Sequence, residues 1–192
     1  MKQFENTDLI EKQINSTSVF RGRLLDVYSD DIELPNGDKA KREYIRHVGV
    51  VCVVPITDDG KVIIEYQYRY PVARVMTEIP AGKLNSKSEP PEEAVRRELL
   101  EETGITAGRL IYLGELIPTC AYSDEIIHMY VAKELKYAER KLDDDEFLNL
   151  CEIPLEELVH EIMEGKIPDA KTQAAVLKLK ILTDCKEIDL HL

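Results

Sequence analysis

Acidic side chains crowd the segment from Gly82 to Ile105, and three of them are spaced for joint chemistry. On a helix with about 3.6 residues per turn, Glu98 lies one turn from both Glu101 and Glu102. Like charges at that spacing destabilise an isolated helix by roughly a few tenths of a kcal/mol per pair. A divalent cation or strong basic partners should therefore compensate them. The alternative is a solvated acidic helix face paired with the nearby Lys and Arg side chains.

The flanking residues predict the helix that carries this patch. Pro90 and Pro91 suit a first helical turn, where an amide hydrogen would have no partner, and Gly104 suits the left-handed residue after a helix end. The helix is therefore expected from Pro91 to Thr103. We expect its apolar stripe to pack on the core while the acids face out of it. The stripe consists of Ala94, Val95, Leu99 and Leu100.

Strands are expected before this helix, and helices towards the end of the chain. A turn at residues 34–38 contains Asn36-Gly37 and predicts a hairpin between strands at 18–34 and 39–47. The nearly continuous apolar run 48–56, an Asp-Gly turn and the segment 61–69 predict a central hairpin. The later elements are expected strands at 109–116 and 126–135 and helices at 155–163 and 170–182.

Composition limits the function classes. The 192 residues can bury a sizeable core, and the net charge of -12 argues against nucleic acid as a partner. Phosphate substrates would also be repelled without a metal ion. No apolar run long enough to cross a membrane is present, and the N-terminus lacks the apolar stretch of a signal peptide, so a cytoplasmic location is expected. The cysteines are not closely spaced and are expected to be reduced packing thiols: Cys52, Cys120, Cys151 and Cys185.

The spacing around the acidic patch resembles the Nudix box. That pattern is Gly, five residues, Glu, seven residues, Arg-Glu, an aliphatic residue, any residue, Glu-Glu, any residue, Gly and an aliphatic residue, and residues 89–105 fit it. Six residues instead of five separate Gly82 from Glu89, which is a one-residue insertion. The resemblance implies an α+β fold, a Nudix-type α/β/α sandwich with a mixed β-sheet. It implies a β-rich N-terminal part at 1–47, a hydrolase domain at 48–192 and a homodimer formed through the N-terminal sheet.

Segments outside the box are similar to the ADP-ribose pyrophosphatase branch of the family. They are Gln67-Tyr68-Arg69-Tyr70-Pro71, Glu78-Ile79-Pro80-Ala81-Gly82-Lys83-Leu84, Pro118 at fourteen residues past Gly104, and the tail 164–172. The resemblance covers about residues 18–182. It implies hydrolysis of ADP-ribose to AMP and ribose 5-phosphate.

The resemblance also implies roles for the box residues. Glu98 and Glu102 are expected to bind Mg²⁺, with Mn²⁺ as the alternative cation, while Glu101 faces the cluster and the carbonyl of Ala81 completes the ligands. A bound cation would neutralise the diphosphate and orient a water molecule. The structural members of the box are expected to be Gly82, Glu89, Arg97 and Gly104, with Glu89 and Arg97 pairing to hold the loop on the helix.

Residues outside the box are expected to supply the general base and substrate contacts. The resemblance implies a general base either in the box or on a later loop, and the matching loop here offers Asp124 and Glu125. Glu125 is the preferred general base, although the pair could merely begin a surface strand. By its place in Gln67-Tyr68-Arg69-Tyr70-Pro71, Arg69 resembles a phosphate-contacting arginine of the family, and its planar guanidinium suits paired phosphate oxygens. Further substrate contacts are expected from Glu78, Pro118 and Arg42, with Phe20 or Tyr28 stacking on adenine; for Arg42, Phe20 and Tyr28 an ordinary strand role is equally compatible.

Two other functions stay open. The chain could hydrolyse another nucleoside diphosphate derivative, such as a nucleotide sugar or dinucleotide, or it could be a non-catalytic sensor that binds ADP-ribose. Retention of the three box acids favours an enzyme over a sensor. Two further motifs are weak: Glu157-x-x-His160 is expected in an ordinary amphipathic helix rather than a di-iron site, and residues 143–146 in a solvated turn rather than a calcium loop.

Overall fold

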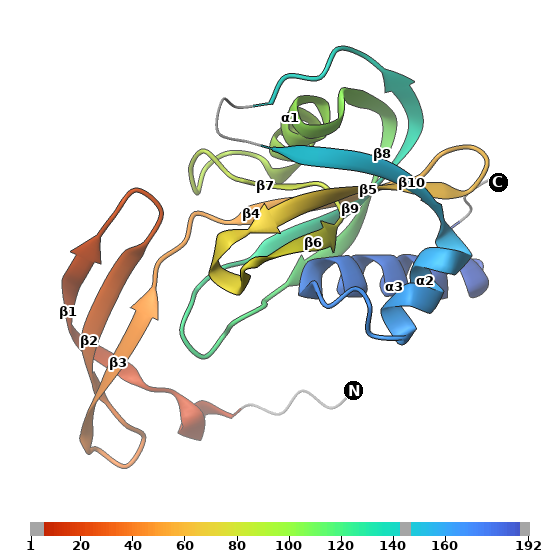
Figure 1. Cartoon of the computed structure of the whole chain (residues 1–192). Helices are drawn as coiled ribbons and strands as arrows, with labels where there is room; N and C mark the ends of the chain where they lie inside the picture. The colour runs from red at the N-terminus through yellow and green to blue at the C-terminus, as the bar shows by residue number, and fades with distance from the viewer. Residues whose placement is uncertain (1–5, 143–146, 189–192) are drawn as a thin grey trace. The chain divides into compact units, whose positions relative to one another are not determined.

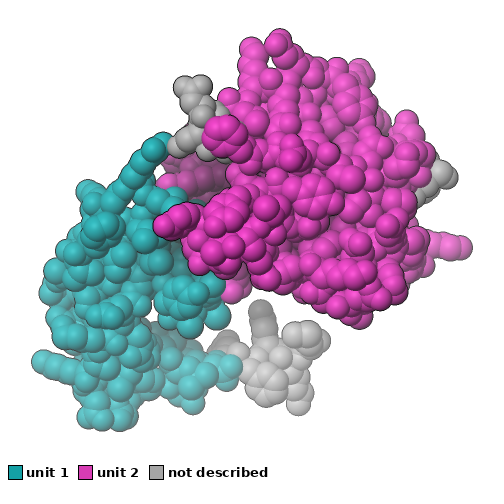
Figure 2. Space-filling model, viewed as in Figure 1, with its two compact units in different colours: residues 1–47, 119–125 teal, residues 48–118, 126–192 magenta. Residues whose placement is uncertain are grey.

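The computed structural model describes residues 6–142 and 147–188. The acidic run 143–146 lies outside the described residues. The chain divides into two compact units, residues 1–47 with 119–125 and residues 48–118 with 126–192 (Figure 2). Each unit has its own sheet structure.

The first unit is a three-stranded antiparallel sheet in the order β1-β2-β3. Its strands are β1 (Lys12–Arg21), β2 (Asp26–Glu33) and β3 (Lys39–Ile45), after a short 3₁₀ turn, η1 (Thr7–Leu9). The predicted hairpin turn joins β2 to β3, and Gly37 adopts the left-handed conformation there with φ of 87°. Residues 119–125 join the sheet, since the Ile45 amide donates to the Tyr122 carbonyl at 2.9 Å. Every residue of β1 is exposed, so this sheet has little core of its own.

The second unit contains two sheets (Figure 1). The larger has the order β7-β4-β9-β8, and its β4 and β9 run parallel while the other pairs are antiparallel. Its strands are β4 (Val50–Pro55), β7 (Ala81–Lys83), β8 (Ile105–Leu116) and β9 (Ile127–Tyr137). The smaller is antiparallel in the order β10-β5-β6, from β5 (Lys61–Arg69), β6 (Arg74–Glu78) and β10 (Leu148–Pro154), with the 3₁₀ turn η2 (Tyr70–Val72) between β5 and β6.

The expected central hairpin is wrong. Strands β4 and β5 lie in different sheets, and an isolated bridge between Ile56 and Val62 links the two runs. Strand β4 and residues 62–65 of β5 are buried on both faces, and β4 pairs instead with β7 and β9. A continuous apolar run reports burial on both sides of a strand but not the identity of the neighbouring strand.

Three helices of the described residues cover the sheets: α1 (Pro91–Thr103), α2 (Leu155–Met163) and α3 (Ala170–Asp184). Successive side chains of β4 face opposite ways. Val51 and Val53 therefore pack in the cluster that contains α1, whereas Cys52 and Val54 pack in the cluster that contains α2 and α3. Figure 1 shows α1 on one side of the strands and α2 and α3 on the other. This arrangement confirms the predicted α/β/α sandwich with a mixed sheet.

The box helix begins and ends where the sequence predicts, but its core-facing side is rotated from the expected one. Gly104 is left-handed, with φ of 69°, and its amide donates to the Leu100 carbonyl at 2.9 Å. Leu100 is 37% exposed, whereas Glu102 is 4% exposed. The cause is helical geometry: Glu102 follows Val95 by seven residues, close to two full turns, so it shares the direction of a buried residue.

The remaining helices are amphipathic as expected. In α2, Leu155, Leu158 and Ile162 are buried, while His160 is exposed and lies 3.2 Å from Glu164. All four cysteines are free thiols, and burial raises the pKa of the Cys52 thiol to about 12. None of the described helices is long and apolar enough to cross a membrane.

Candidate active site

Strand β7 and helix α1 bring two of the predicted metal ligands against the same stretch of backbone. The Glu98 carboxylate lies directly on Gly82, since a Cβ atom added there would overlap it. The Ala81 amide donates a hydrogen bond to Glu102 Oε2 at 3.0 Å. A residue without a side chain at position 82 is therefore what allows the strand to approach the helix acids.

Arg97 gathers the acids around it. Its Nη1 lies 2.6 Å from Glu98 Oε1 and 3.2 Å from Glu101 Oε2. Its Nη2 donates to the Lys83 carbonyl at 3.2 Å and lies 3.4 Å from Glu89 Oε1. Burial opposes the charge of Arg97, but the carboxylates outweigh it and raise the arginine pKa. Arg97 therefore ties the helix, the strand and the loop between them.

Glu89 closes the loop that carries the inserted residue. The Asn85 side-chain amide donates to Glu89 Oε1 at 3.1 Å, and the Asn85 backbone amide donates to Glu89 Oε2. The Glu89 backbone amide donates to the Ser86 carbonyl at 3.1 Å. The Asn85 hydrogen bond and the Arg97 charge lower the pKa of Glu89. The loop from Asn85 to Glu89 is thus a closed turn.

These residues fit a divalent cation in donor chemistry. Carboxylate and backbone carbonyl oxygens are the ligands that hard divalent cations prefer, and Glu98 and Glu102 converge on the β7 backbone. Among the described residues, no group of three His, Cys, Asp or Glu side chains is already arranged to hold a metal ion. Arg97 contacts Glu98 and Glu101 in this arrangement.

Arg69 and Glu78 form a bidentate ion pair beside the box. Arg69 Nε and Nη2 each lie 2.8 Å from a different oxygen of Glu78. The Glu78 side chain is 3% exposed and that of Arg69 is 41% exposed. The hydrogen bond to Glu78 raises the pKa of Arg69, and the charges of Glu65 and Glu102 act in the same direction. Burial alone would raise the pKa of Glu78, but Arg69 and Lys171 outweigh it and lower the pKa.

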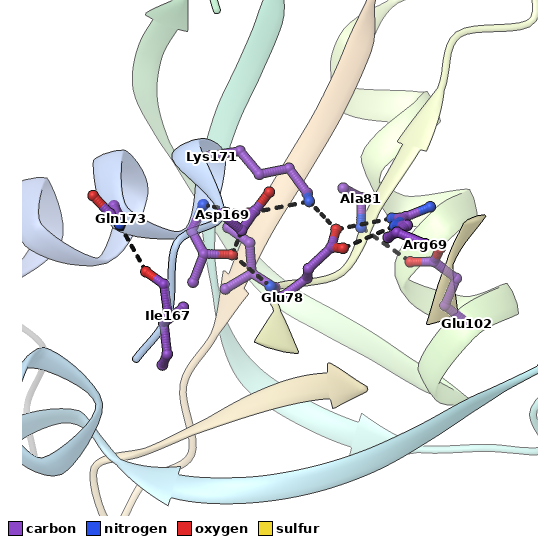
Figure 3. A network of polar contacts seen from close by, with 10 residues as sticks. Arg69, Glu78, Ala81, Glu102, Ile167, Asp169, Lys171 and Gln173 are labelled. Atoms are coloured by element: carbon purple, nitrogen blue, oxygen red, sulfur yellow. Dashed lines mark hydrogen bonds and ion pairs between the residues drawn. The ribbon is translucent and has the colours of Figure 1, made fainter. Parts of the chain in front are cut away.

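A network of hydrogen bonds and ion pairs at the start of α3 contacts the Glu78 side of this pair (Figure 3). Lys171 Nζ donates to Glu78 Oε2 and lies 3.1 Å from Asp169 Oδ2. Asp169 caps α3 by accepting hydrogen bonds from the Thr172 amide at 2.9 Å and hydroxyl at 2.6 Å. The Thr172 Oγ1 atom accepts a hydrogen bond from the buried Ile79 amide at 2.9 Å. The end of β6 is therefore joined to a helix that begins about ninety residues later in the chain.

Sequence reasoning assigned no role to Asp169, Lys171 or Thr172, nor to Glu65, which is fully buried in β5. One signal was available for Asp169, because an Asp before an apolar-periodic segment is a typical helix cap. No comparable signal marked Lys171 as buried, because lysine is usually exposed.

The remaining predicted residues are distributed between the two units. Pro118 follows β8 in the second unit and is half-buried. In the first unit, Glu125 is half-buried and its amide donates to Ser123 Oγ at 3.2 Å. Arg42 pairs with Glu11. The other first-unit candidates are Phe20, which is 55% exposed, and Tyr28, whose ring carries the Arg46 guanidinium at 3.7 Å.

Comparison with known proteins places these features in a family. Residues 45–176 match the NUDIX domain, and residues 11–45 match the nucleoside diphosphate sugar hydrolase N-terminal domain. The chain is 42% identical over 175 residues to the ADP-ribose pyrophosphatase of Bacillus subtilis (strain 168), covering 90% of this chain and 94% of that protein.

Two further comparisons extend this likeness. The chain is 43% identical over 173 residues to the methanol dehydrogenase activator of Bacillus methanolicus, covering 89% of this chain and 93% of that protein. A crystal structure of an ADP compounds hydrolase superposes with a TM-score of 0.81 at 26% identity, covering 93% of this chain and 97% of the other. The chain belongs to the Nudix family of hydrolases.

Proposed function

We propose that this Nudix hydrolase cleaves the pyrophosphate bond of ADP-ribose and releases AMP and ribose 5-phosphate in the presence of Mg²⁺. The observation that carries the proposal is the position of Arg69. Its half-exposed guanidinium is held by Glu78, which lies three residues before Ala81, and the Ala81 amide donates to Glu102 of the box helix at 3.0 Å. A diphosphate requires both an anion-binding group and a cation-binding group, and these residues provide both.

Nudix hydrolases generally use divalent metal ions, and Mg²⁺ suits the oxygen donors present here. Glu98 and Glu102 would hold it, with Glu101 and the Ala81 carbonyl as further donors. When bound, the ion would neutralise the diphosphate and lower the pKa of a water molecule. The side chains Arg97 and Glu89 keep the loop and the helix together, as their contacts indicate.

Arg69 is proposed to bind phosphate oxygens, with Arg42, Glu78 and Pro118 as further substrate contacts. Both carboxylate oxygens of Glu78 already accept hydrogen bonds from Arg69 or Lys171, which supports a role for Glu78 in substrate binding that acts through Arg69. The general base is proposed to be Glu125. Glu125→Gln should lower kcat by about 10²-fold or more, as expected for loss of a general base. Asp124→Asn tests the neighbouring carboxylate, and a near-normal rate for Glu125→Gln would remove Glu125 from the mechanism.

The substrate assignment is tested by incubating the protein with Mg²⁺ and a panel of diphosphates, then separating the products. ADP-ribose should be consumed fastest and should give AMP. Other relatives are named GDP-mannose pyrophosphatase, at 30% identity, and ADP compounds hydrolase, at 29% identity, so GDP-mannose, NADH and diadenosine polyphosphates belong in the panel. Faster turnover of one of these would replace ADP-ribose as the substrate.

A sensor function is separated from catalysis by Glu102→Gln. This variant should bind ADP-ribose but lose turnover, because the box would lack a carboxylate donor. Glu93→Gln is the matched control, since Glu93 is an exposed glutamate in the first turn of the same helix. Binding of ADP-ribose by the unaltered protein without turnover of any diphosphate in the panel would favour the sensor.

A homodimer is also proposed, formed through the first unit. Strand β1 is exposed along its length, and Ile14, Val19 and Phe20 are each more than half exposed. Exposed apolar side chains on a sheet favour association. Light scattering should give twice the mass of 22.0 kDa, and Val19→Lys with Phe20→Lys should reduce it towards that value. A monomer at micromolar concentration would refute the dimer.

We propose a cytoplasmic location on the sequence features alone.

A further inference from the structure

The buried lysine of α3 is unusual because it serves a carboxylate that is already paired. Lys171 is 9% exposed, and its Nζ donates to the same Glu78 oxygen that accepts from Arg69 Nη2. Burial by itself would lower the pKa of Lys171, but Asp169 and Glu78 outweigh burial and raise it. Lys171 is therefore held as a cation. A buried cation needs partners of this kind, because desolvation of a charge is costly.

The charges around Arg69 explain why a second cation matters. Arg69 faces Glu78 directly and feels the charges of Glu65 and Glu102. An arginine surrounded by carboxylates presents little net positive charge to an added anion. Lys171, on α3, offsets part of this negative charge. It does so through Glu78 and does not occupy Arg69 Nη1, the guanidinium nitrogen that Glu78 does not bind.

The geometry of the pair also depends on α3. Glu78 uses Oε1 for Arg69 Nε alone, while Oε2 is shared between Arg69 Nη2 and Lys171. Within the described part of the chain, Arg69 Nη1 donates no hydrogen bond to protein. Lys171 holds the side chain of Glu78, and Thr172 holds the backbone amide of the next residue, Ile79. Because Glu78 binds the guanidinium through both of its oxygens, these two contacts orient the plane of the Arg69 guanidinium.

We propose that Lys171 is a positioning residue for phosphate binding: it holds Glu78 from behind and offsets the carboxylates around Arg69, so that Arg69 can bind a diphosphate. This inference rests on the proposed role of Arg69 in binding the substrate diphosphate. Lys171 itself does not contact substrate in this scheme. It acts through Glu78 and Arg69.

The test uses Lys171→Met, which keeps the side-chain length and removes the charge. Lys180→Met is the matched control, because Lys180 lies on the same helix and also pairs with two carboxylates, Glu156 and Asp184. Lys171→Met should raise the KM for ADP-ribose about tenfold, the size expected for loss of one charge near a bound anion, with kcat changed much less. Lys180→Met should leave both constants unchanged.

A second pair of variants separates charge and orientation from simple loss of a contact. Asparagine caps helices as well as aspartate does, so Asp169→Asn preserves the start of α3 while removing one negative charge. Asp169→Asn added to Lys171→Met should recover most of the lost affinity, and Asp169→Asn alone should not raise KM. If the single Asp169 variant raises KM as much as Lys171→Met does, the charge-offset role is overturned.

A measurement without substrate keeps the proposal testable apart from the proposed function. The Arg69 Nε–H resonance, assigned by its absence in Arg69→Lys, should be protected in the unaltered protein and in Lys180→Met but broadened or shifted in Lys171→Met. If the unaltered protein does not hydrolyse ADP-ribose, the proposed function fails, and this resonance still decides whether Lys171 positions Arg69. An unchanged resonance in folded Lys171→Met would overturn the proposal, as would an unchanged KM.

Discussion

Gly82 is the point at which one added methyl group should separate catalysis from stability. A Cβ at this position would overlap the carboxylate of Glu98, and the atoms in the way are the far end of a flexible side chain. Gly82→Ala should therefore push the Glu98 carboxylate aside and leave the backbone in place. The residue is not in the left-handed region, so alanine adds no backbone strain.

The two consequences differ in size. Overpacking that a side chain can relieve costs about 1 kcal/mol, which for a chain of this length lowers Tm by about 2–4 °C. Displacement of a catalytic group by about 1 Å can cost about 10²-fold in rate, which corresponds to about 2.7 kcal/mol of transition-state stabilisation. The expected result is a large loss of kcat with a small shift in Tm.

The assay compares turnover of ADP-ribose and thermal unfolding for Gly82→Ala and Gly108→Ala. Gly108 is the comparison position, because a Cβ there would also meet a glutamate, at 2.5 Å from Glu134 Oε2 and 2.9 Å from Glu134 Cβ, on a strand outside the box. Gly108→Ala should keep its turnover. Wild-type turnover in Gly82→Ala would refute the reasoning that the approach of Glu98 to Gly82 matters for catalysis.

Three further predictions concern the loop and helix of the box. Arg97→Lys should lower the free energy of unfolding by about 1–2 kcal/mol, because an ammonium cannot replace the contacts of the guanidinium fork, and urea denaturation measures this. The folded-state pKa of Glu89 lies below its usual value, so the stability contributed by Glu89 is present above the unfolded pKa of about 4.3 and is lost as pH falls through the folded pKa. Urea unfolding midpoints should therefore fall less steeply from pH 6 to pH 3 in Glu89→Gln than in the unaltered protein. Equal slopes would contradict this. Leu99→Ala should cost about 2–5 kcal/mol because Leu99 is fully buried, whereas Leu100→Ala should cost less than about 1 kcal/mol; equal losses would show that the burial of the helix is misassigned.

Local signals explain why the box helix could be predicted to the residue. Pro91 at its first position and Gly104 after its last act through the backbone of their own neighbours, so no distant part of the chain is needed to interpret them. The hairpin turn at Gly37 is a signal of the same kind. Such features depend on contacts between residues that are close in sequence.

Pairing between residues far apart in sequence explains why the central hairpin was predicted wrongly and why the role of Lys171 was not predicted. Strand β4 pairs in parallel with β9, and the two are separated by more than seventy residues. The apolar run 50–55 therefore carries no information that identifies β9 as the neighbouring strand. Lys171 and Glu78 are 93 residues apart, and their pairing depends on how α3 meets β6. Hydrophobic periodicity reports which face of an element is buried. It does not report which charged residue will meet another across the core.

The charges around the site fall into two sets with opposite needs. In the first, Glu89, Glu98 and Glu101 meet at the guanidinium of Arg97, and carboxylates gathered in this way favour a cation. In the second, Arg69 and Lys171 face Glu78 and Asp169, so opposite charges balance at close range. Glu102 links the sets, because it accepts from the β7 backbone and its charge acts on Arg69. A metal ion at the first set would weaken that negative influence on Arg69, so metal and diphosphate binding should favour each other.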